Sequence, residues 1–590
     1  MERTKFFSTM KLWREFVVEK TARNKFVANL FALLSFLTIA MVISVNCKFD
    51  FRWDFTNYHY YNPFAFFYNR LNFDIVPASI NTFFNPLLDI PLYFLIRHFN
   101  DNLNLIFAVQ GLWFGLLLFV FYKITRLFFD KNKVVDWLRV FAIVAVGATS
   151  QIVWFQIGSS TNEIQVSFIG LVAIYMLLEM IKFEEKQKLY KFLLAGIVLG
   201  IALGLKPTIV YICVSSGVGL ILCYKYLSQP IKAIALFALG GLLGYLLING
   251  WWMYKMWVLY ENPFFPFLNG IFKSPWFDNF NYSDTRFIPQ GFRKFIFPYT
   301  WNGQNAETYF FDFRGMFFYT LAICFVVYMS IKPARWKDFA KNRLWCFYAV
   351  FLFLSYIIWM NLFGIYRYII VIEMLSAIFF VKILFSYKTE NNIRFALYYS
   401  FVVIASTILI LIPRDSYEWD NLRKEKKFVD VEKVKLPENT LLKLYNFPSA
   451  GVIVELTKEN EFRALGYKHL NAIYMKGSDF VERGRFHKIR DEIVKNHKGE
   501  TVVIYRMMNS MLPWYQDYMI SVNKELDGKY CRRLENNLDK GLCICVPENK
   551  KDEILIAKYD DELSCEDKTI KIKNNFIKKL NKIMSNKGAL

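Results

Sequence analysis

Long apolar runs separated by short basic connections dominate residues 26–412 of the chain. The first run spans Phe26 to Asn46, and the later ones are also close to the roughly 20 residues that cross a bilayer as a helix. Lys and Arg gather in every second connection, as they do on the cytosolic side of membrane proteins. The pattern predicts an α-helical polytopic membrane protein with about eleven transmembrane helices and a basic cytosolic amino terminus, residues 1–25.

Two long connections interrupt the apolar runs on the opposite, external side. The first covers residues 47–103 and contains two segments with the character of surface helices, Asn57 to Asn69 and Pro86 to Phe99. The second covers residues 250–314, where prolines punctuate aromatic residues and oppose a continuous helix. The last predicted span is Phe395 to Ile412. An odd number of spans places everything after it outside.

Residues 413–590 have the composition of a soluble domain that ends in a basic tail. Short runs rich in apolar and β-branched residues predict strands, and these are LLKLYNF, GVIVEL, TVVIYRM and LCICVP. The stretch Arg485 to Asn496 has apolar residues at helical spacing and predicts an amphipathic helix. A small extracytoplasmic α/β domain accounts for this pattern.

Composition supports the membrane assignment and narrows the function. The 590 residues are 55% hydrophobic and 19% aromatic, and their formal charge is +22. The positive charge lies in the predicted cytosolic connections, so it indicates insertion topology and no nucleic-acid partner. Of nine cysteines, none has metal-site spacing; four late ones could form disulfides if their region is exported, namely Cys531, Cys543, Cys545 and Cys565.

The stretch FRWDFTNYHYYNPFAF, residues 51–66, follows the first predicted span and surrounds Asp54 with aromatic, hydroxyl and amide side chains. A carboxylate with limited access to water is suited to act as a general base. An aromatic belt at the membrane interface with a solvated aspartate is the alternative interpretation. His59 belongs to the same stretch and fits a wall or substrate contact better than a metal ligand.

Three further ionisable residues are predicted to lie at external ends of spans. Glu163 stands in the short turn GSSTNE, where it could also cap a helix. Lys206 ends the Gly-rich segment AGIVLGIALGLKPT, where it either marks a functional site or extends toward water. Arg367 lies in FGIYRYI and could bind a phosphate through two parallel hydrogen bonds or pair with an acid such as Glu373.

The order of these motifs resembles the membrane-embedded C-type glycosyltransferases, the GT-C superfamily, which includes protein O-mannosyltransferases and the lipid A aminoarabinose transferase. The similar elements are WDFTNYH with Asp54, LGIALGLKPT, NPFFPFLN and YRY, all within residues 26–412. Many members carry paired acids in the first external loop, whereas here Asp54 has only Asp50 nearby. Dependence on a divalent metal ion is therefore left open, with no metal ligand assigned.

The resemblance implies an inverting glycosyltransferase that uses a sugar on a polyprenyl phosphate and acts at the outer face of a bacterial inner membrane. Asp54 would deprotonate a hydroxyl on a lipid, glycan or protein acceptor, while Lys206 and Arg367 would bind the departing phosphate. The remaining substrate contacts would be Tyr58, His59, Glu163 and Tyr368. A flippase for lipid-linked glycans and an O-antigen polymerase or ligase are the alternatives.

Overall fold

The computed structural model is mostly helical and ends in a small sheet. It describes residues 26–129, 134–296, 312, 314–332, 334–384, 419–437, 439–445, 450–459, 470–476, 484–506, 525–539, 541–555 and 565. The chain forms two compact units, each built from separate parts of the sequence. Unit 1 holds residues 1–50, 103–248 and 284–424, and unit 2 holds residues 51–102, 249–283 and 425–590.

Five helices are long and apolar enough to cross a membrane. They are Phe26–Cys47, α5 (Leu103–Phe128), α8 (Glu163–Lys182), α11 (Pro230–Tyr260) and α16 (Arg343–Leu362). Several expose large apolar side chains, for example Phe31 at 73% and Leu247 at 70%. Such surfaces are unfavourable in water and are compatible with contact to lipid. The finer count of eleven spans stays a prediction, and the last of them, residues 395–412, lies outside the described residues.

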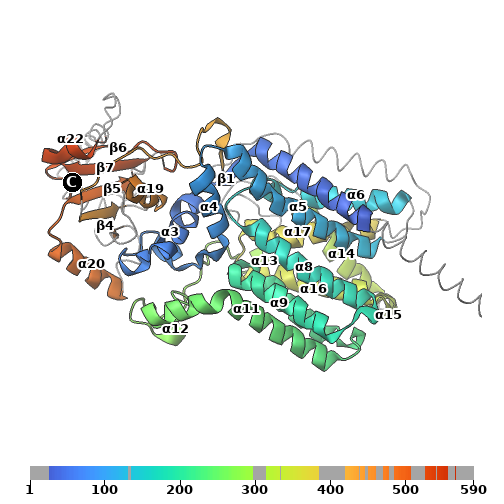
Figure 1. Ribbon diagram of the computed structural model, residues 1–590. Helices are drawn as coiled ribbons and strands as arrows, with labels where there is room; N and C mark the ends of the chain where they lie inside the picture. The colour runs from blue at the N-terminus through green and yellow to red at the C-terminus, as the bar shows by residue number, and fades with distance from the viewer. Residues whose placement is uncertain are drawn as a thin grey trace, which may run out of the picture. The chain divides into compact units, whose positions relative to one another are not determined.

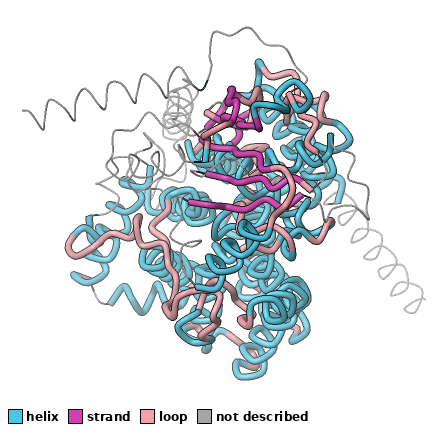
Figure 2. The backbone as a smooth tube through the Cα atoms, turned by 90° about the vertical axis from the view of Figure 1, so that its left-hand side faces the viewer, coloured by secondary structure: helices cyan, strands magenta, loops and turns pink. Residues whose placement is uncertain are grey.

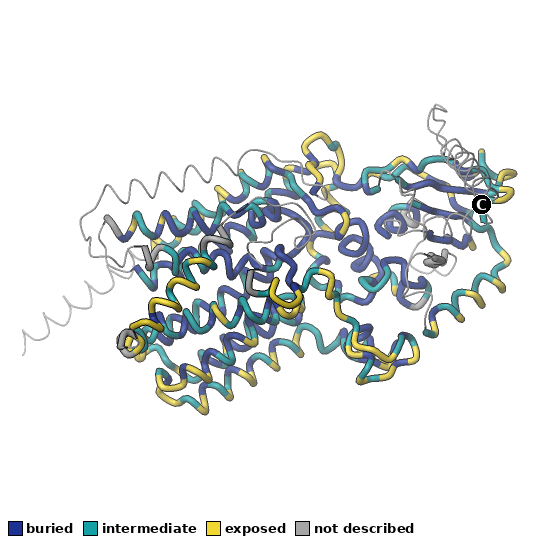
Figure 3. The backbone as a smooth tube through the Cα atoms, turned by 180° about the vertical axis from the view of Figure 1, so that it is seen from behind, coloured by how far each residue is buried: buried dark blue, intermediate teal, exposed yellow. Residues whose placement is uncertain are grey.

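Unit 1 is a bundle in which helices distant in sequence pack together. α8 lies against both α5 and α9 (Figure 1), and α10 lies against α16. Buried and exposed stretches alternate along these helices (Figure 3), as expected when one face packs on the bundle. The other helices of this unit are α6 (Val134–Ala148), α7 (Gln151–Gln156), α9 (Leu189–Leu205), α10 (Val210–Leu222), α13 (Arg293–Ile296), α14 (Arg314–Ile331), α15 (Ala334–Lys341) and α17 (Ile370–Leu384).

Glycines let α9 and the first part of α11 approach each other closely. A Cβ atom added at Gly200 would lie 2.1 Å from the carbonyl oxygen of Gly241, and one added at Gly244 would lie 2.1 Å from that of Ile197. Both distances are far below van der Waals contact, so neither position has room for a side chain. This is the small-residue packing by which helices associate in membranes.

The helical part of unit 2 comes largely from the first predicted external loop. After the short strand β1 (Phe49–Phe51) and the helical turn α2 (Arg52–Asp54), the chain forms a π-helical segment, η1 (Phe55–His59). α3 (Tyr61–Phe67) and α4 (Ile90–Phe99) follow, so both segments expected to be helical are helical over most of their length. Four shorter elements complete this part, namely η2 (Arg70–Asn72), η3 (Ser79–Phe83), η4 (Pro86–Leu88) and α12 (Asn269–Phe272).

The carboxyl-terminal part of unit 2 contains a five-stranded sheet of order β4-β3-β5-β7-β6. β3 pairs in parallel with β4 and β5, and β7 pairs antiparallel with β5 and β6. Figure 2 shows these strands side by side with helices next to them. The elements are β3 (Thr440–Tyr445), α19 (Gly451–Glu459), β4 (Leu470–Lys476), α20 (Gly484–Asn496), β5 (Thr501–Arg506), β6 (Lys529–Arg533), β7 (Leu542–Pro547) and α22 (Lys551–Ile554).

Three of the four predicted strands and the predicted amphipathic helix are confirmed as β3, β5, β7 and α20. The strand predicted for GVIVEL is wrong, because these residues begin helix α19. Val452, Ile453 and Leu456 are buried in that helix, and their spacing also fits one helical face. A short apolar run does not distinguish a buried strand from a buried helix.

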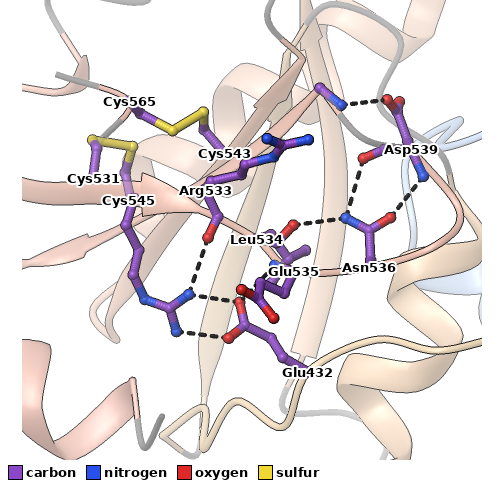
Figure 4. The surroundings of a disulfide bond; sticks show 12 residues. Glu432, Cys531, Arg533, Leu534, Glu535, Asn536, Asp539, Cys543, Cys545 and Cys565 are labelled. Atoms are coloured by element: carbon purple, nitrogen blue, oxygen red, sulfur yellow. Dashed lines mark hydrogen bonds and ion pairs between the residues drawn. A yellow bond between two sulfur atoms is a disulfide. The ribbon is translucent and has the colours of Figure 1, made fainter. Parts of the chain in front are cut away.

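Two disulfides join the late cysteines. Cys531 pairs with Cys545, directly opposite on the neighbouring strands β6 and β7, and Cys543 pairs with Cys565 (Figure 4). The positions of these cysteines in the sequence do not determine which of them pair. Disulfides of this kind persist in oxidising compartments such as the periplasm.

Candidate functional site

Asp54, the residue predicted to be the base, directly precedes the π-helical segment of unit 2. Asp54 caps this segment and is 2% exposed, and all five residues of the segment are buried. A π-helix is bonded from residue i to i+5, and here the Tyr60 amide donates to the Phe55 carbonyl. The Phe55 and Tyr60 rings are consequently stacked, with centroids 5.4 Å apart. π-Helical turns occur frequently at functional sites.

His59 forms a buried pair with Asp89. The Nδ1 atom of His59 lies 2.6 Å from Oδ1 of Asp89, and both residues are 5% exposed. The ring of Tyr58 packs on that of His59 with centroids 4.1 Å apart, so the two predicted substrate contacts of this loop touch each other. Nε2 of His59 is buried and has no hydrogen-bond partner among the described residues.

Asn62 supplies a second buried acceptor in this unit. Its Nδ2 atom donates to the carbonyl oxygens of Asn81 and Phe84, at 2.9 and 3.5 Å. These bonds leave Oδ1, which is buried and has no partner in the described part of the chain. When the protein supplies no partner for a buried polar atom, a water, an ion or another bound group usually does.

A neighbouring buried ion pair in unit 2 is fully engaged and structural. Arg70, fully buried, donates to both carboxylate oxygens of Asp74, and the Tyr61 hydroxyl also donates to Asp74 at 2.7 Å. The bidentate geometry compensates for removing these charges from water. The sequence analysis did not identify this group, although the i,i+4 spacing of an Arg and an Asp was visible in it.

The carboxyl-terminal domain contacts the candidate loop directly. The Tyr60 hydroxyl donates to Oε1 of Glu455 on α19 at 2.5 Å. Gly451, at the start of α19, lies so close that an added Cβ atom would be 2.9 Å from the Thr56 carbonyl oxygen. Arg52 donates to the Phe428 carbonyl at 3.2 Å. The loop is therefore held from both sides of its π-helical segment.

In unit 1, the turn between α7 and α8 connects several of the other predicted residues. Gln156, Ser160 and Thr161 are each about 1% exposed. Asp50 accepts hydrogen bonds from both the amide and the hydroxyl of Ser160. The Thr161 hydroxyl donates to the Gln156 side chain, whose amide donates to the Arg367 carbonyl at 3.3 Å. The turn is thus a buried polar network at the ends of apolar helices.

Lys206 and Glu163 form the charged part of this network. Lys206 Nζ lies 2.5 Å from Oε1 of Glu163 and also donates to the Thr161 carbonyl. An ion pair removed from water is stable only when attraction between its charges and further hydrogen bonds offset the loss of hydration. Both residues were predicted from separate motifs, and their pairing was not predicted.

Arg367 and Tyr368 lie on the short helix η9 (Tyr366–Ile369). An Arg367 nitrogen lies 3.4 Å from the Tyr368 hydroxyl, and Tyr211 donates to the Tyr368 carbonyl at 2.9 Å. Glu373, the acid considered as a partner for Arg367, accepts a hydrogen bond from the Tyr366 hydroxyl at 2.6 Å. Unit 1 therefore brings four of the predicted residues into one network, namely Glu163, Lys206, Arg367 and Tyr368.

The remaining predicted residues, Asp54, Tyr58 and His59, belong to unit 2, and a site shared with unit 1 stays a prediction. Within the described ranges, no three His, Cys, Asp or Glu side chains are grouped so that they could hold a metal ion. Comparisons with models of protein families, with curated proteins and with solved structures found no match.

Proposed function

We propose that the chain is a membrane glycosyltransferase that moves a sugar from a polyprenyl-phosphate donor to a hydroxyl acceptor at the extracytoplasmic face. In this proposal, Lys206 and Arg367 bind the departing phosphate. The loop that holds Asp54 and His59 handles the acceptor hydroxyl, and one of these two residues takes its proton.

The observation that carries the proposal is the buried polar network around the turn 156–163 of unit 1. Ionisable residues at the ends of apolar helices are costly to bury and commonly mark sites for polar ligands. Here the Lys206 ammonium donates to the Thr161 carbonyl of this turn, and the backbone carbonyl of Arg367 accepts a hydrogen bond from Gln156.

The chemistry of glycosyl transfer fits such a network. When the bond from the sugar to the phosphate breaks, negative charge grows on the phosphate oxygen. Positioned cations and hydrogen-bond donors stabilise that charge and lower the barrier. A planar guanidinium such as that of Arg367 matches two phosphate oxygens, which supports its assignment to the donor.

The two disulfides of the carboxyl-terminal domain support the proposed orientation. Four cysteines are paired, and disulfides are rare in reducing cytosol. Export of this domain agrees with a reaction on the extracytoplasmic face. Since the same domain contacts the candidate loop through Glu455, the proposal places that loop on the same side.

Transfer by the purified chain in lipid vesicles tests the proposal. Polyprenyl phosphates carrying radiolabelled hexoses or pentoses serve as donors, and alkyl glycosides serve as hydroxyl acceptors. Formation of a labelled glycoside with release of polyprenyl phosphate supports the transferase. Movement of the intact donor across the vesicle without bond cleavage would contradict it and identify a flippase.

A further inference from the structure

We propose that His59, held by Asp89, accepts the proton of the acceptor hydroxyl. This inference rests on the function proposed above and concerns only its proton acceptor, a role that the sequence analysis assigned to Asp54.

The contact with Asp89 determines which nitrogen of His59 can take a proton. An ionised carboxylate only accepts hydrogen bonds, so the 2.6 Å contact puts the imidazole hydrogen on Nδ1. Nε2 then carries the lone pair. An imidazole fixed by a carboxylate at one nitrogen, with the other available, is the arrangement that general-base histidines use.

The surroundings indicate what kind of molecule approaches Nε2. Nε2 of His59 and Oδ1 of Asn62 are both buried, both accept hydrogen bonds and both lack a donor among the described residues. The two residues are three positions apart, on either side of the junction between η1 and α3. Two acceptors without donors fit a ligand with several hydroxyl groups, such as the glycoside acceptor.

Asp54 directly precedes the π-helical segment that ends at His59, and both residues are buried. In this proposal the charge of Asp54 favours the imidazolium that forms, while His59 takes the proton.

The step is balanced without any further reactant. The acceptor oxygen forms a bond to the anomeric carbon of the sugar, and its proton moves to Nε2 of His59. The bond from the anomeric carbon to the phosphate oxygen breaks, and its electron pair leaves with polyprenyl phosphate. His59 then returns the proton to water, while Nδ1 stays bonded to Asp89 throughout.

Single-turnover transfer and donor binding by His59→Gln, Asp89→Asn and Asp54→Asn test the assignment. With the full chain in vesicles, His59→Gln should lower the transfer rate by about 10²–10⁴-fold and leave donor binding unchanged. Asp89→Asn should lower it strongly, and Asp54→Asn much less. His98→Gln is the matched control, because His98 is an exposed histidine on α4.

Other outcomes also decide the question. Transfer by His59→Gln within about twofold of the parent, or loss of its donor binding together with transfer, contradicts a proton-accepting role. If Asp54→Asn alone is inactive, Asp54 is the base. If the parent itself transfers no sugar, the proposed function fails. That result differs from the outcomes above, in which the parent is active and only a variant changes.

Discussion

Nζ of Lys206 lies 2.5 Å from Oε1 of Glu163, and the two side chains are only 14% and 3% exposed. The pair joins the end of α9 to the start of α8, 43 positions apart. Because the carboxylate partly neutralises the ammonium, Lys206 should be the weaker ligand of the proposed phosphate site. We expect that site to depend more on Arg367.

Removal of one member of this pair should destabilise unit 1 more than removal of both. Lys206→Met or Glu163→Leu alone leaves a buried charge without its partner, which typically lowers the free energy of unfolding by about 3–5 kcal/mol. The double variant should recover a large part of this loss. Thermal unfolding of the three variants in one detergent measures it, and additive effects would contradict a direct pairing.

Arg367→Ala should weaken donor binding more than Lys206→Ala does. Loss of a charged hydrogen-bonding group from a binding site costs about 2–5 kcal/mol, and the charge of Lys206 is already shared with Glu163. Arg367→Lys should recover only part of the affinity, because an ammonium lacks the planar fork. Titration with a polyprenyl-phosphate sugar gives the order. Equal effects of both alanine variants would contradict it.

The same Gly to Ala change should have opposite effects at two positions of unit 1. At Gly200 the new Cβ atom would lie 2.1 Å from the Gly241 carbonyl oxygen, whereas at Gly217 the nearest atom is 4.0 Å away. Gly200→Ala should force α9 and α11 apart and lower the free energy of unfolding by about 1–3 kcal/mol. Gly217→Ala, within helix α10, should raise it by up to about 1 kcal/mol through helix propensity.

The apolar pattern predicted a helix well where an apolar run of membrane-spanning length is bounded by polar connections. The first apolar helix, Phe26–Cys47, ends within one residue of the predicted span Phe26 to Asn46. The strands β5 and β7 were predictable for a similar reason, because short β-branched runs have few other uses in a soluble domain. In GVIVEL the same signal failed, since six residues fit one turn and a half of helix equally well.

The contacts of the candidate site were much less predictable. Asp89 is 30 positions from His59, and it lies in a segment that the sequence analysis read only as a surface helix. The π-helical turn after Asp54 has no composition signal that distinguishes it from an α-helix. Each motif indicated polar chemistry, but only the folded chain shows which charges compensate one another, as Glu163 does for Lys206.

Thiol counting in isolated membranes should reveal both disulfides. The chain has nine cysteines, and the structure leaves five of them as free thiols. A denatured, unreduced chain should therefore take up five maleimide–polymer adducts, and a reduced chain nine. The double variant Cys531→Ser/Cys545→Ser should still take up five adducts without reductant. It loses only the two cysteines of one disulfide, and the other disulfide remains. Nine adducts without reductant would contradict an oxidised, exported domain.

The hydrogen bond from Tyr60 to Glu455 should couple the candidate loop to helix α19. The bond is 2.5 Å long, and a hydrogen bond to a charged group contributes about 1.5–3 kcal/mol. In a double-variant cycle with Tyr60→Phe and Glu455→Gln, the two losses in the free energy of unfolding should not add. Tyr68→Phe, in the same loop, is the control and should add to the effect of Glu455→Gln.

The coupling between Tyr60 and Glu455 should also depend on pH in a defined direction. Burial, and then the neighbouring Glu455 carboxylate, raise the pKa of the Tyr60 phenol well above its ordinary value. The phenol therefore stays protonated in the folded chain while an unfolded chain loses the proton above about pH 10. Stability from Tyr60 is fully present below that pH and declines as pH rises through and beyond it. The difference in free energy of unfolding between the parent and Tyr60→Phe should consequently shrink from pH 9 to about pH 11. Urea unfolding of both chains across this range measures it, and a constant difference would mean that the phenol is exposed to water in the folded chain.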